Sequence, residues 1–152
     1  MKRLLFICIA SVAIATYVGA DDAKPADDAK AIEGMWKPVQ AELAGKPMPD
    51  AVLKTISLKL EDGKYEVFVG DSPDRGTYTL DPAATPKAIT ITSTEGANQG
   101  KTFPSIYELG HDDSAGETLR ICYDLSGQKR PTEFKTTPGT KLYLVTYRRK
   151  KE

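Results

Sequence analysis

The side chains best suited to nucleophilic catalysis in this chain of 152 residues are a cysteine and a histidine. His111 is the only histidine, and Cys122 is the only cysteine beyond the first twenty residues. A cysteine nucleophile needs an adjacent base, and no pattern in the sequence places His111 beside Cys122. We therefore expect no catalytic residue and interpret Cys122 as an inert, buried thiol. Because it alternates with apolar neighbours, either another segment covers it or the alternation shifts locally.

The acidic residues are weak candidates for a metal site or an acid–base pair. Residues 111–113 are His-Asp-Asp, but adjacent residues on a loop seldom supply a complete ligand set, and their spacing matches neither a zinc site nor an EF-hand. Asp71 and Asp74 lie in the segment 70–76, whose Gly, Ser and Pro content is typical of a hairpin loop. We therefore expect solvated turns at both places, and neither a metal nor another cofactor.

Three polar residues are candidates for contacts to a ligand: Tyr107, Tyr123 and Arg130. Arg130 lies in a proline-containing turn before the last predicted strand, where its guanidinium could bind a carboxylate or phosphate in bidentate geometry. The alternative is that Arg130 pairs with Asp124 or Glu133 and fixes the turn. Tyr107 and Tyr123 lie on predicted strands and combine an aromatic ring with a hydroxyl group.

Short runs of alternating apolar and polar residues must position these candidates. The alternation has a period of two and is rich in Thr, Ile, Val and Tyr, which predicts strands with one buried face. It is clearest in residues 56–61, 65–69, 77–80, 89–92 and 119–124. Asp62-Gly63 separates the first two runs and is a strong signal for a two-residue hairpin. Further strands are predicted near residues 36–43, 103–109 and 141–148.

The connections between these strands are too short for parallel pairing. They carry Gly, Pro or Asp at nearly every turn, whereas a parallel crossover needs about a dozen residues or more. We therefore predict an all-β fold, an antiparallel up-and-down barrel of about eight strands that leaves no sheet edge exposed. A two-sheet sandwich is the alternative. Residues 49–54 are expected to form one short helical turn that caps an end of the barrel.

The alternation also predicts which side chains face the barrel interior. These side chains are medium-sized or large: Trp36, Leu58, Leu60, Tyr65, Val67, Tyr78, Ile89, Ile91, Leu119, Ile121 and Tyr123. A barrel of about eight strands is just wide enough to be filled by such side chains or to hold one small ligand. The sequence leaves both outcomes open, a dry core and a small apolar pocket.

The first twenty residues predict export. Basic residues precede an apolar run of about 15 residues, and Val18-Gly19-Ala20 offers the small residues of a cleavage site. The run is shorter than the roughly 20 residues that a membrane-spanning helix needs. We expect residues 1–20 to be a cleaved signal peptide, residues 21–31 a disordered spacer and residues 32–152 the barrel domain. The product is expected in the periplasm or outside the cell, without a stable membrane anchor.

The charge balance argues against nucleic acid or an anionic membrane as a partner. The chain has 21 basic and 21 acidic residues, and loss of Lys2 and Arg3 with the signal would leave 19 against 21. Such a balance gives no general attraction to either polyanion. Cys122 would be the only cysteine left, so no intramolecular disulfide could form and the domain would rely on its core.

The start of the first predicted strand, Gly34-x-Trp36, resembles the lipocalin signature. In lipocalins the tryptophan closes one end of the barrel, and an arginine near the end of the last strand packs over its ring. Arg148 and Arg149 stand at the matching place, and we expect Arg148 to cover Trp36.

More widely, residues 32–148 resemble a family of uncharacterised, exported, lipocalin-like domains of planctomycete bacteria. The matching stretches are Gly34-x-Trp36, Glu42-Leu43-x-Gly45-Lys46-Pro47, Gly76-x-Tyr78, Pro86-Lys87-Ala88-Ile89, Gly100-Lys101, Ile106-Tyr107-Glu108-Leu109, Cys122-Tyr123 and Arg130-Pro131-Thr132-Glu133-Phe134. The resemblance implies the barrel fold and carries over no activity or binding residue. Residues 44–54, which follow the first strand, form a shorter connection than in most lipocalins, which argues against a lipocalin-sized cavity.

Two functions fit these features, and neither is enzymatic, because no nucleophile–base pair or metal set supports a hydrolase. The first is binding of a small, mostly apolar ligand at one barrel mouth by the three candidate residues. The second is a filled barrel that acts as a protein-interaction module or inhibitor towards an exported partner. It would contact the partner through its N-terminal spacer or through its loops, residues 70–76, 95–100 and 110–116. A cavity well below about 300 Å³ favours the second function.

Overall fold

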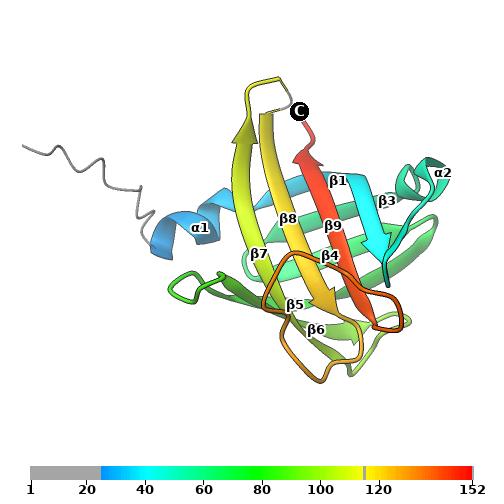
Figure 1. Cartoon of the computed structure of the whole chain (residues 1–152). Helices are drawn as coiled ribbons and strands as arrows, with labels where there is room; N and C mark the ends of the chain where they lie inside the picture. Colours follow the sequence, from blue (N-terminus) through cyan, green and yellow to red (C-terminus); the bar gives the residue numbers. More distant parts are fainter. Residues whose placement is uncertain (1–24, 115, 152) are drawn as a thin grey trace, which may run out of the picture.

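The computed structural model describes residues 25–114 and 116–151, so the predicted signal peptide lies outside the described residues. Nine strands form one antiparallel sheet, and β1 and β9 pair with each other, which closes the sheet (Figure 1). β2 (Lys46–Pro47) pairs only with β1, so the other eight strands make the ring. They are β1 (Gly34–Leu43), β3 (Ile56–Glu61), β4 (Lys64–Val69), β5 (Ser72–Asp81), β6 (Ala88–Glu95), β7 (Thr102–Asp112), β8 (Gly116–Asp124) and β9 (Leu142–Arg149).

Apart from β2, every strand pairs with its neighbours in chain order. The prediction of an antiparallel, up-and-down, eight-stranded lipocalin-like barrel is therefore confirmed. The Asp62-Gly63 hairpin is confirmed as well, because both residues have positive φ angles, 49° and 73°. Positive φ at both central residues is what a type I′ turn requires, and its twist matches that of the strands it joins.

The predicted hairpin at residues 70–76 is present, but its loop is limited to residues 70–71, so the assignment of residues 72–76 to the loop is wrong. β5 begins at Ser72, and Asp74 is buried on the inward face that it shares with Gly76 and Tyr78, two and four residues further on. Strand parity therefore outweighs the turn-like composition, because Asp74 finds hydrogen-bond partners inside the barrel. Residues 110–112 likewise belong to β7, which shortens the expected loop at residues 110–116.

All the side chains predicted to face inward belong to the hydrophobic core or pack against it. Further members that the sequence analysis did not name are Ile32, Ala41, Leu53, Phe103, Tyr107, Val145 and Tyr147. Most of these lie outside the clearest alternating runs, which explains why pattern alone did not select them.

Two short helices lie at opposite ends of β1: α1 (Pro25–Ala31) precedes it and α2 (Asp50–Leu53) follows it (Figure 1). α2 confirms the helical turn predicted for residues 49–54. α1 is a helix within residues 21–31, which were expected to be disordered; residues 21–24 of that range lie outside the described residues. Asp28 on α1 is only 3% exposed, and its carboxylate accepts hydrogen bonds from Tyr107 Oη at 2.6 Å and from Lys87 Nζ at 2.9 Å.

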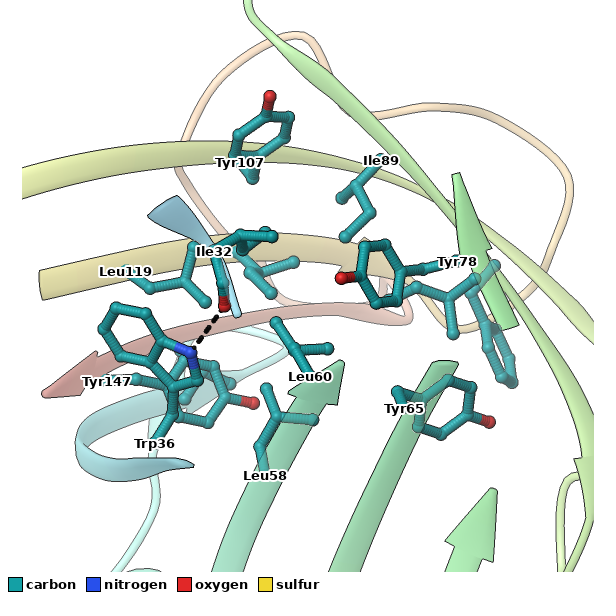
Figure 2. Packing of buried hydrophobic residues seen from close by; sticks show 14 of the residues in the cluster. Ile32, Trp36, Leu58, Leu60, Tyr65, Tyr78, Ile89, Tyr107, Leu119 and Tyr147 are labelled. Carbon is teal, nitrogen blue, oxygen red and sulfur yellow. Dashed lines mark hydrogen bonds between the residues drawn. The ribbon is translucent and has the colours of Figure 1, made fainter. Parts of the chain in front are cut away.

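Trp36 closes the barrel at the α1 end. Its ring is fully buried, and its Nε1 donates a hydrogen bond to the Ile32 carbonyl at 2.9 Å (Figure 2). The guanidinium over the ring belongs to Arg149, at 4.3 Å from the ring to Cζ, and not to Arg148 as expected. The reason is strand parity: Tyr147 and Arg149 share the inward face of β9, whereas Arg148 is exposed. Gly34 lies beside the Arg149 guanidinium and has a φ of 126°, a backbone conformation that residues with a side chain rarely adopt.

Candidate functional site

A cavity of about 160 Å³ occupies the barrel at the end opposite Trp36. Val69 and Leu125 line it and are 53% and 37% exposed, so the cavity opens to solvent between the ends of β4 and β8. Its walls are mostly apolar, since the inward faces of β3, β4, β6, β7 and β8 contribute aliphatic and aromatic side chains. These include Ile56, Leu58, Val67, Ile89, Ile91, Phe103 and Ile121.

Tyrosines supply one side of the cavity wall. Tyr123 stacks on Tyr143 with ring centroids 5.6 Å apart, and its hydroxyl lies 3.2 Å from that of Tyr147. Burial raises the pKa of Tyr123, Tyr143 and Tyr147 above the usual range, so these hydroxyls stay protonated at neutral pH. The wall therefore offers aromatic surface with two neutral hydroxyls bonded to each other.

A buried carboxylate lies at the opposite side of the same cavity. Asp74 is 9% exposed, and its Oδ1 accepts hydrogen bonds from Tyr65 Oη at 2.6 Å and Ser93 Oγ at 2.9 Å. Its Oδ2 accepts from the backbone N of Asn98 at 3.1 Å and from Asn98 Nδ2 at 2.9 Å. Burial, and then the bond to Asp74, raises the pKa of Tyr65, so this hydroxyl remains a donor. Asp74, Tyr65 and Asn98 all line the cavity.

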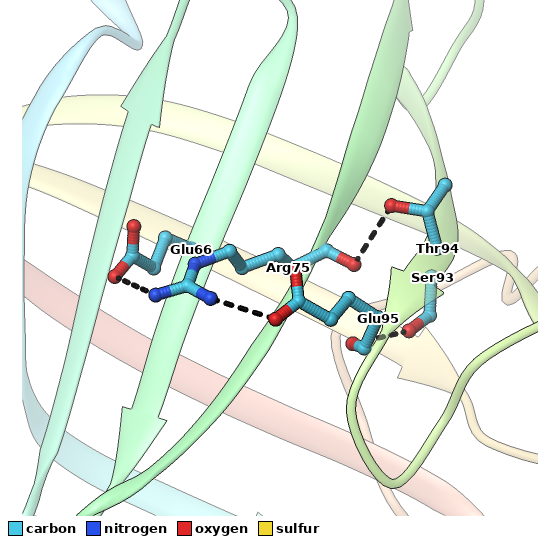
Figure 3. Close-up of polar contacts among 5 residues, drawn as sticks. All are labelled: Glu66, Arg75, Ser93, Thr94 and Glu95. Atoms are coloured by element: carbon cyan, nitrogen blue, oxygen red, sulfur yellow. Dashed lines mark hydrogen bonds and ion pairs between the residues drawn. The ribbon is translucent and has the colours of Figure 1, made fainter.

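A β-bulge and an ion-pair row on the outer face hold β5 and β6 in register beside Asp74. Arg75 pairs with Glu95, and Gly76 pairs with Ser93, which leaves Thr94 as the extra residue of the bulge. The Arg75 guanidinium contacts Glu66 at 3.2 Å and Glu95 at 2.9 Å, and Thr94 Oγ1 donates to the Arg75 carbonyl (Figure 3). The bulge directs Ser93 inward, where its hydroxyl reaches Asp74.

The structure does not bring the three predicted ligand-binding residues together. Tyr123 lines the cavity, but Tyr107 is buried at the closed end with its hydroxyl bonded to Asp28. Arg130 lies outside the barrel, where it donates to the carbonyls of Ile89 and Ser105. Tyr107 and Arg130 therefore have structural partners and do not line the cavity.

The alternative expected for Arg130, an ion pair with Asp124 or Glu133, is not formed either. Asp124 instead accepts hydrogen bonds from Ser126 and from the backbone N of Gln128 and Lys129. Burial raises the pKa of Asp124, but these hydrogen bonds outweigh that effect, and the pKa is lowered overall. Asp124 thus fixes the turn that Arg130 was expected to fix.

Cys122 is fully buried although it faces outward from β8. The connection between β8 and β9, residues 125–141, covers it, and its Sγ lies 3.8 Å from the Lys135 carbonyl. The Arg120 guanidinium packs 4.7 Å over the Phe134 ring and holds this connection against the barrel. Of the two explanations for a non-exposed Cys122, coverage by another segment is therefore the correct one. Burial raises the pKa of the thiol, which disfavours the reactive thiolate.

His111 is exposed on β7, away from Cys122 in the ladder. Among residues 25–114 and 116–151, no three His, Cys, Asp or Glu side chains gather in a way that could hold a metal ion. Within the same part of the chain, no helix is long and apolar enough to cross a bilayer.

The comparisons with known proteins add no relative: no protein-family model, no curated protein and no solved structure matches this chain. The site therefore has to be interpreted from its own geometry. The sequence analysis missed Asp74, Asn98, Tyr143 and Tyr147 as members of the cavity wall. For Asp74 a signal was present, because it stands two residues before Gly76 and four before Tyr78 and so shares their face.

Proposed function

We propose that this protein is an exported, non-enzymatic binding protein that takes a small, mostly apolar group into the cavity at the open end of the barrel. The observation that carries the proposal is the cavity itself, with its volume of about 160 Å³, its apolar walls and its mouth at Val69 and Leu125. An apolar cavity of about 150 Å³ is large enough to bind benzene. A single ring or a short alkyl chain therefore fits.

The volume also limits the ligand. Pockets for drug-sized ligands usually measure about 300–1,000 Å³, so a molecule of that size could insert only its apolar end. The closed half of the barrel offers no additional room, because Trp36, Leu119 and Tyr147 fill it. The bound group is thus expected to be small or to protrude through the mouth.

The small volume also favours the second candidate, a protein-interaction module or inhibitor. At about 160 Å³ the cavity is well below the usual range for a ligand pocket. In that case an exported protein partner would contact the rim, where Val69 and Leu125 are exposed and the loop at residues 95–100 lies close by. The export component of both proposals rests on residues 1–20 and is tested by N-terminal sequencing of the protein recovered outside the cytoplasm.

The cavity proposal is tested with toluene as an apolar probe. At about ten times its Kd, a ligand that binds only the folded state raises the free energy of unfolding by roughly 1.4 kcal/mol, seen as a saturable rise in Tm. Val67→Phe places a ring into the cavity and is expected to abolish this rise. Val39→Phe makes the same change at an exposed position on β1 and should leave it intact. Absence of saturable binding to the unaltered protein would overturn the cavity proposal and favour the interaction module.

A further inference from the structure

We infer that the molecule bound in this cavity is a small organic amine whose ammonium group binds at Asp74; the inference rests on the proposed function. Among the described residues that line the cavity, Asp74 is the only acidic or basic one. Its carboxylate is part of the cavity wall and accepts hydrogen bonds from Asn98 on the adjacent turn.

Within the described part of the chain, the Asp74 carboxylate forms no ion pair with a Lys, Arg or His side chain. All its hydrogen-bond donors, on Tyr65, Ser93 and Asn98, are neutral, and none of the ion pairs there includes it. Two other acids are buried in this part of the chain: Asp28 on α1 has the Lys87 ammonium at 2.9 Å, whereas Asp124 is bonded to neutral donors of its own turn and does not line the cavity. Burial of a carboxylate without a cation is unfavourable, and a cationic ligand would remove that penalty.

The cavity can admit an ammonium group at this point. A carboxylate has about four acceptor sites, and neutral donors occupy them at Asp74. The most replaceable donor is Asn98 Nδ2, since Asn98 lies on the β6–β7 turn and is only half-buried. The nearby Lys101 ammonium contacts Asn98 Oδ1 at 3.5 Å and does not itself donate to the Asp74 carboxylate. An ammonium donor carries a charge opposite to that of the carboxylate, so it would bind Asp74 more strongly than the uncharged amide that it replaces.

The aromatic rings of the wall favour the same ligand class. Tyr65, Tyr123 and Tyr143 line the cavity together with Asp74. The faces of aromatic rings attract cations, and this attraction strengthens when water is excluded. Of these three tyrosines, Tyr65 lies directly beside Asp74 and could attract the charge of an amine, whereas Tyr123 and Tyr143 across the cavity would contact its hydrocarbon part together with the aliphatic wall.

The test compares three probes of similar size and different charge: benzylamine, benzyl alcohol and benzoate. Calorimetric titration of the unaltered full-length domain should show benzylamine binding about tenfold or more tightly than benzyl alcohol, and benzoate binding more weakly than both. Equal affinities for benzylamine and benzyl alcohol would overturn the amine inference and leave the cavity proposal standing. If none of the three probes nor toluene binds, the cavity proposal fails and the inference fails with it.

Asp74→Asn provides the matched variant, because the amide keeps the size of the side chain and removes its charge. The preference for benzylamine over benzyl alcohol should disappear, while benzyl alcohol still binds. Asp71→Asn removes a charge from the neighbouring exposed turn and should retain the preference. A preference that survives in Asp74→Asn would contradict the inference. The probe series uses the unaltered protein, so the inference stays testable even if Asp74→Asn does not fold.

Discussion

The two ends of the barrel are built from the same strands but differ in what fills them. At the closed end, Trp36 is fully buried, and Arg149 covers its ring. At the open end, Val69 and Leu125 are exposed around a cavity of about 160 Å³. The difference arises from side-chain size and from the helix that covers one end, because the strand pairing is continuous around the ring. A closed sheet alone therefore determines neither a filled nor a hollow interior.

The buried acids of the two ends repeat this contrast. Asp28 at the closed end is paired with Lys87 and accepts a hydrogen bond from Tyr107. Asp74 at the open end has only neutral donors. At the closed end the buried carboxylate thus has a cationic partner within the protein, which is expected of a structural element. At the open end the buried carboxylate has no such partner, and a cationic ligand could neutralise it.

The largest effect that should separate the two ends is that of side-chain truncation. Trp36→Ala removes a fully buried ring and its hydrogen bond to Ile32, and we expect a loss of about 3–5 kcal/mol in the free energy of unfolding. Leu125→Ala at the rim of the cavity should cost less than about 1 kcal/mol, because the side chain is already 37% exposed. Urea unfolding measures both. Equal losses would contradict the division into a structural end and an open end.

The contact between α1 and the barrel should give the next largest effect. Asp28→Ala removes the acceptor of the Tyr107 hydroxyl and the partner of Lys87, with an expected loss of about 2–3 kcal/mol. Asp50→Ala removes an exposed aspartate from the first turn of α2 at the other end and should cost less than about 1 kcal/mol. Thermal unfolding followed by circular dichroism compares the two variants. A loss below 1 kcal/mol for Asp28→Ala would show that α1 does not contribute to closing the barrel.

The smallest effect distinguishes the two adjacent arginines of β9. Arg149→Ala removes the guanidinium over Trp36 and its hydrogen bonds to the carbonyls of Ala31 and Glu33, which we expect to cost about 1–2 kcal/mol. Arg148→Ala changes an exposed neighbour and should stay within about 0.5 kcal/mol. Chemical denaturation of both variants at the same ionic strength checks the difference. The reverse order would contradict the strand parity of β9.

The fold could be predicted from the sequence to a large extent because local patterns determine it. The alternation in residues 56–61 and 65–69, with Asp62-Gly63 between them, already contains one hairpin, and similar runs supply most other strands. α1 could not be predicted in this way, because the buried partner of Asp28 is Tyr107, 79 positions later in the chain. No local pattern reports such a contact.

The candidate site was harder to predict, because a side chain that is able to bind a ligand does not reveal from its type alone whether it lines the cavity. Arg130 and Tyr107 have groups that bind ligands in many proteins, yet here they bond to backbone carbonyls and to Asp28. Asp74 follows Ser72 and Pro73, which are typical of a loop. Its position on the inward face follows from parity, but its burial depends on donors from β4, β6 and the β6–β7 turn.

The pairing of β1 with β9 means that the first and last strands of the ring depend on each other. A chain that stops short of Leu142 can form seven successive strands of the ring, yet it would present the unpaired backbones of β1 and β8 as two free borders. Such borders recruit strands from other molecules. Chains truncated before β9 are therefore expected to self-associate. In the intact chain, β9 pairs with both β1 and β8 and so prevents these strands from pairing with another molecule.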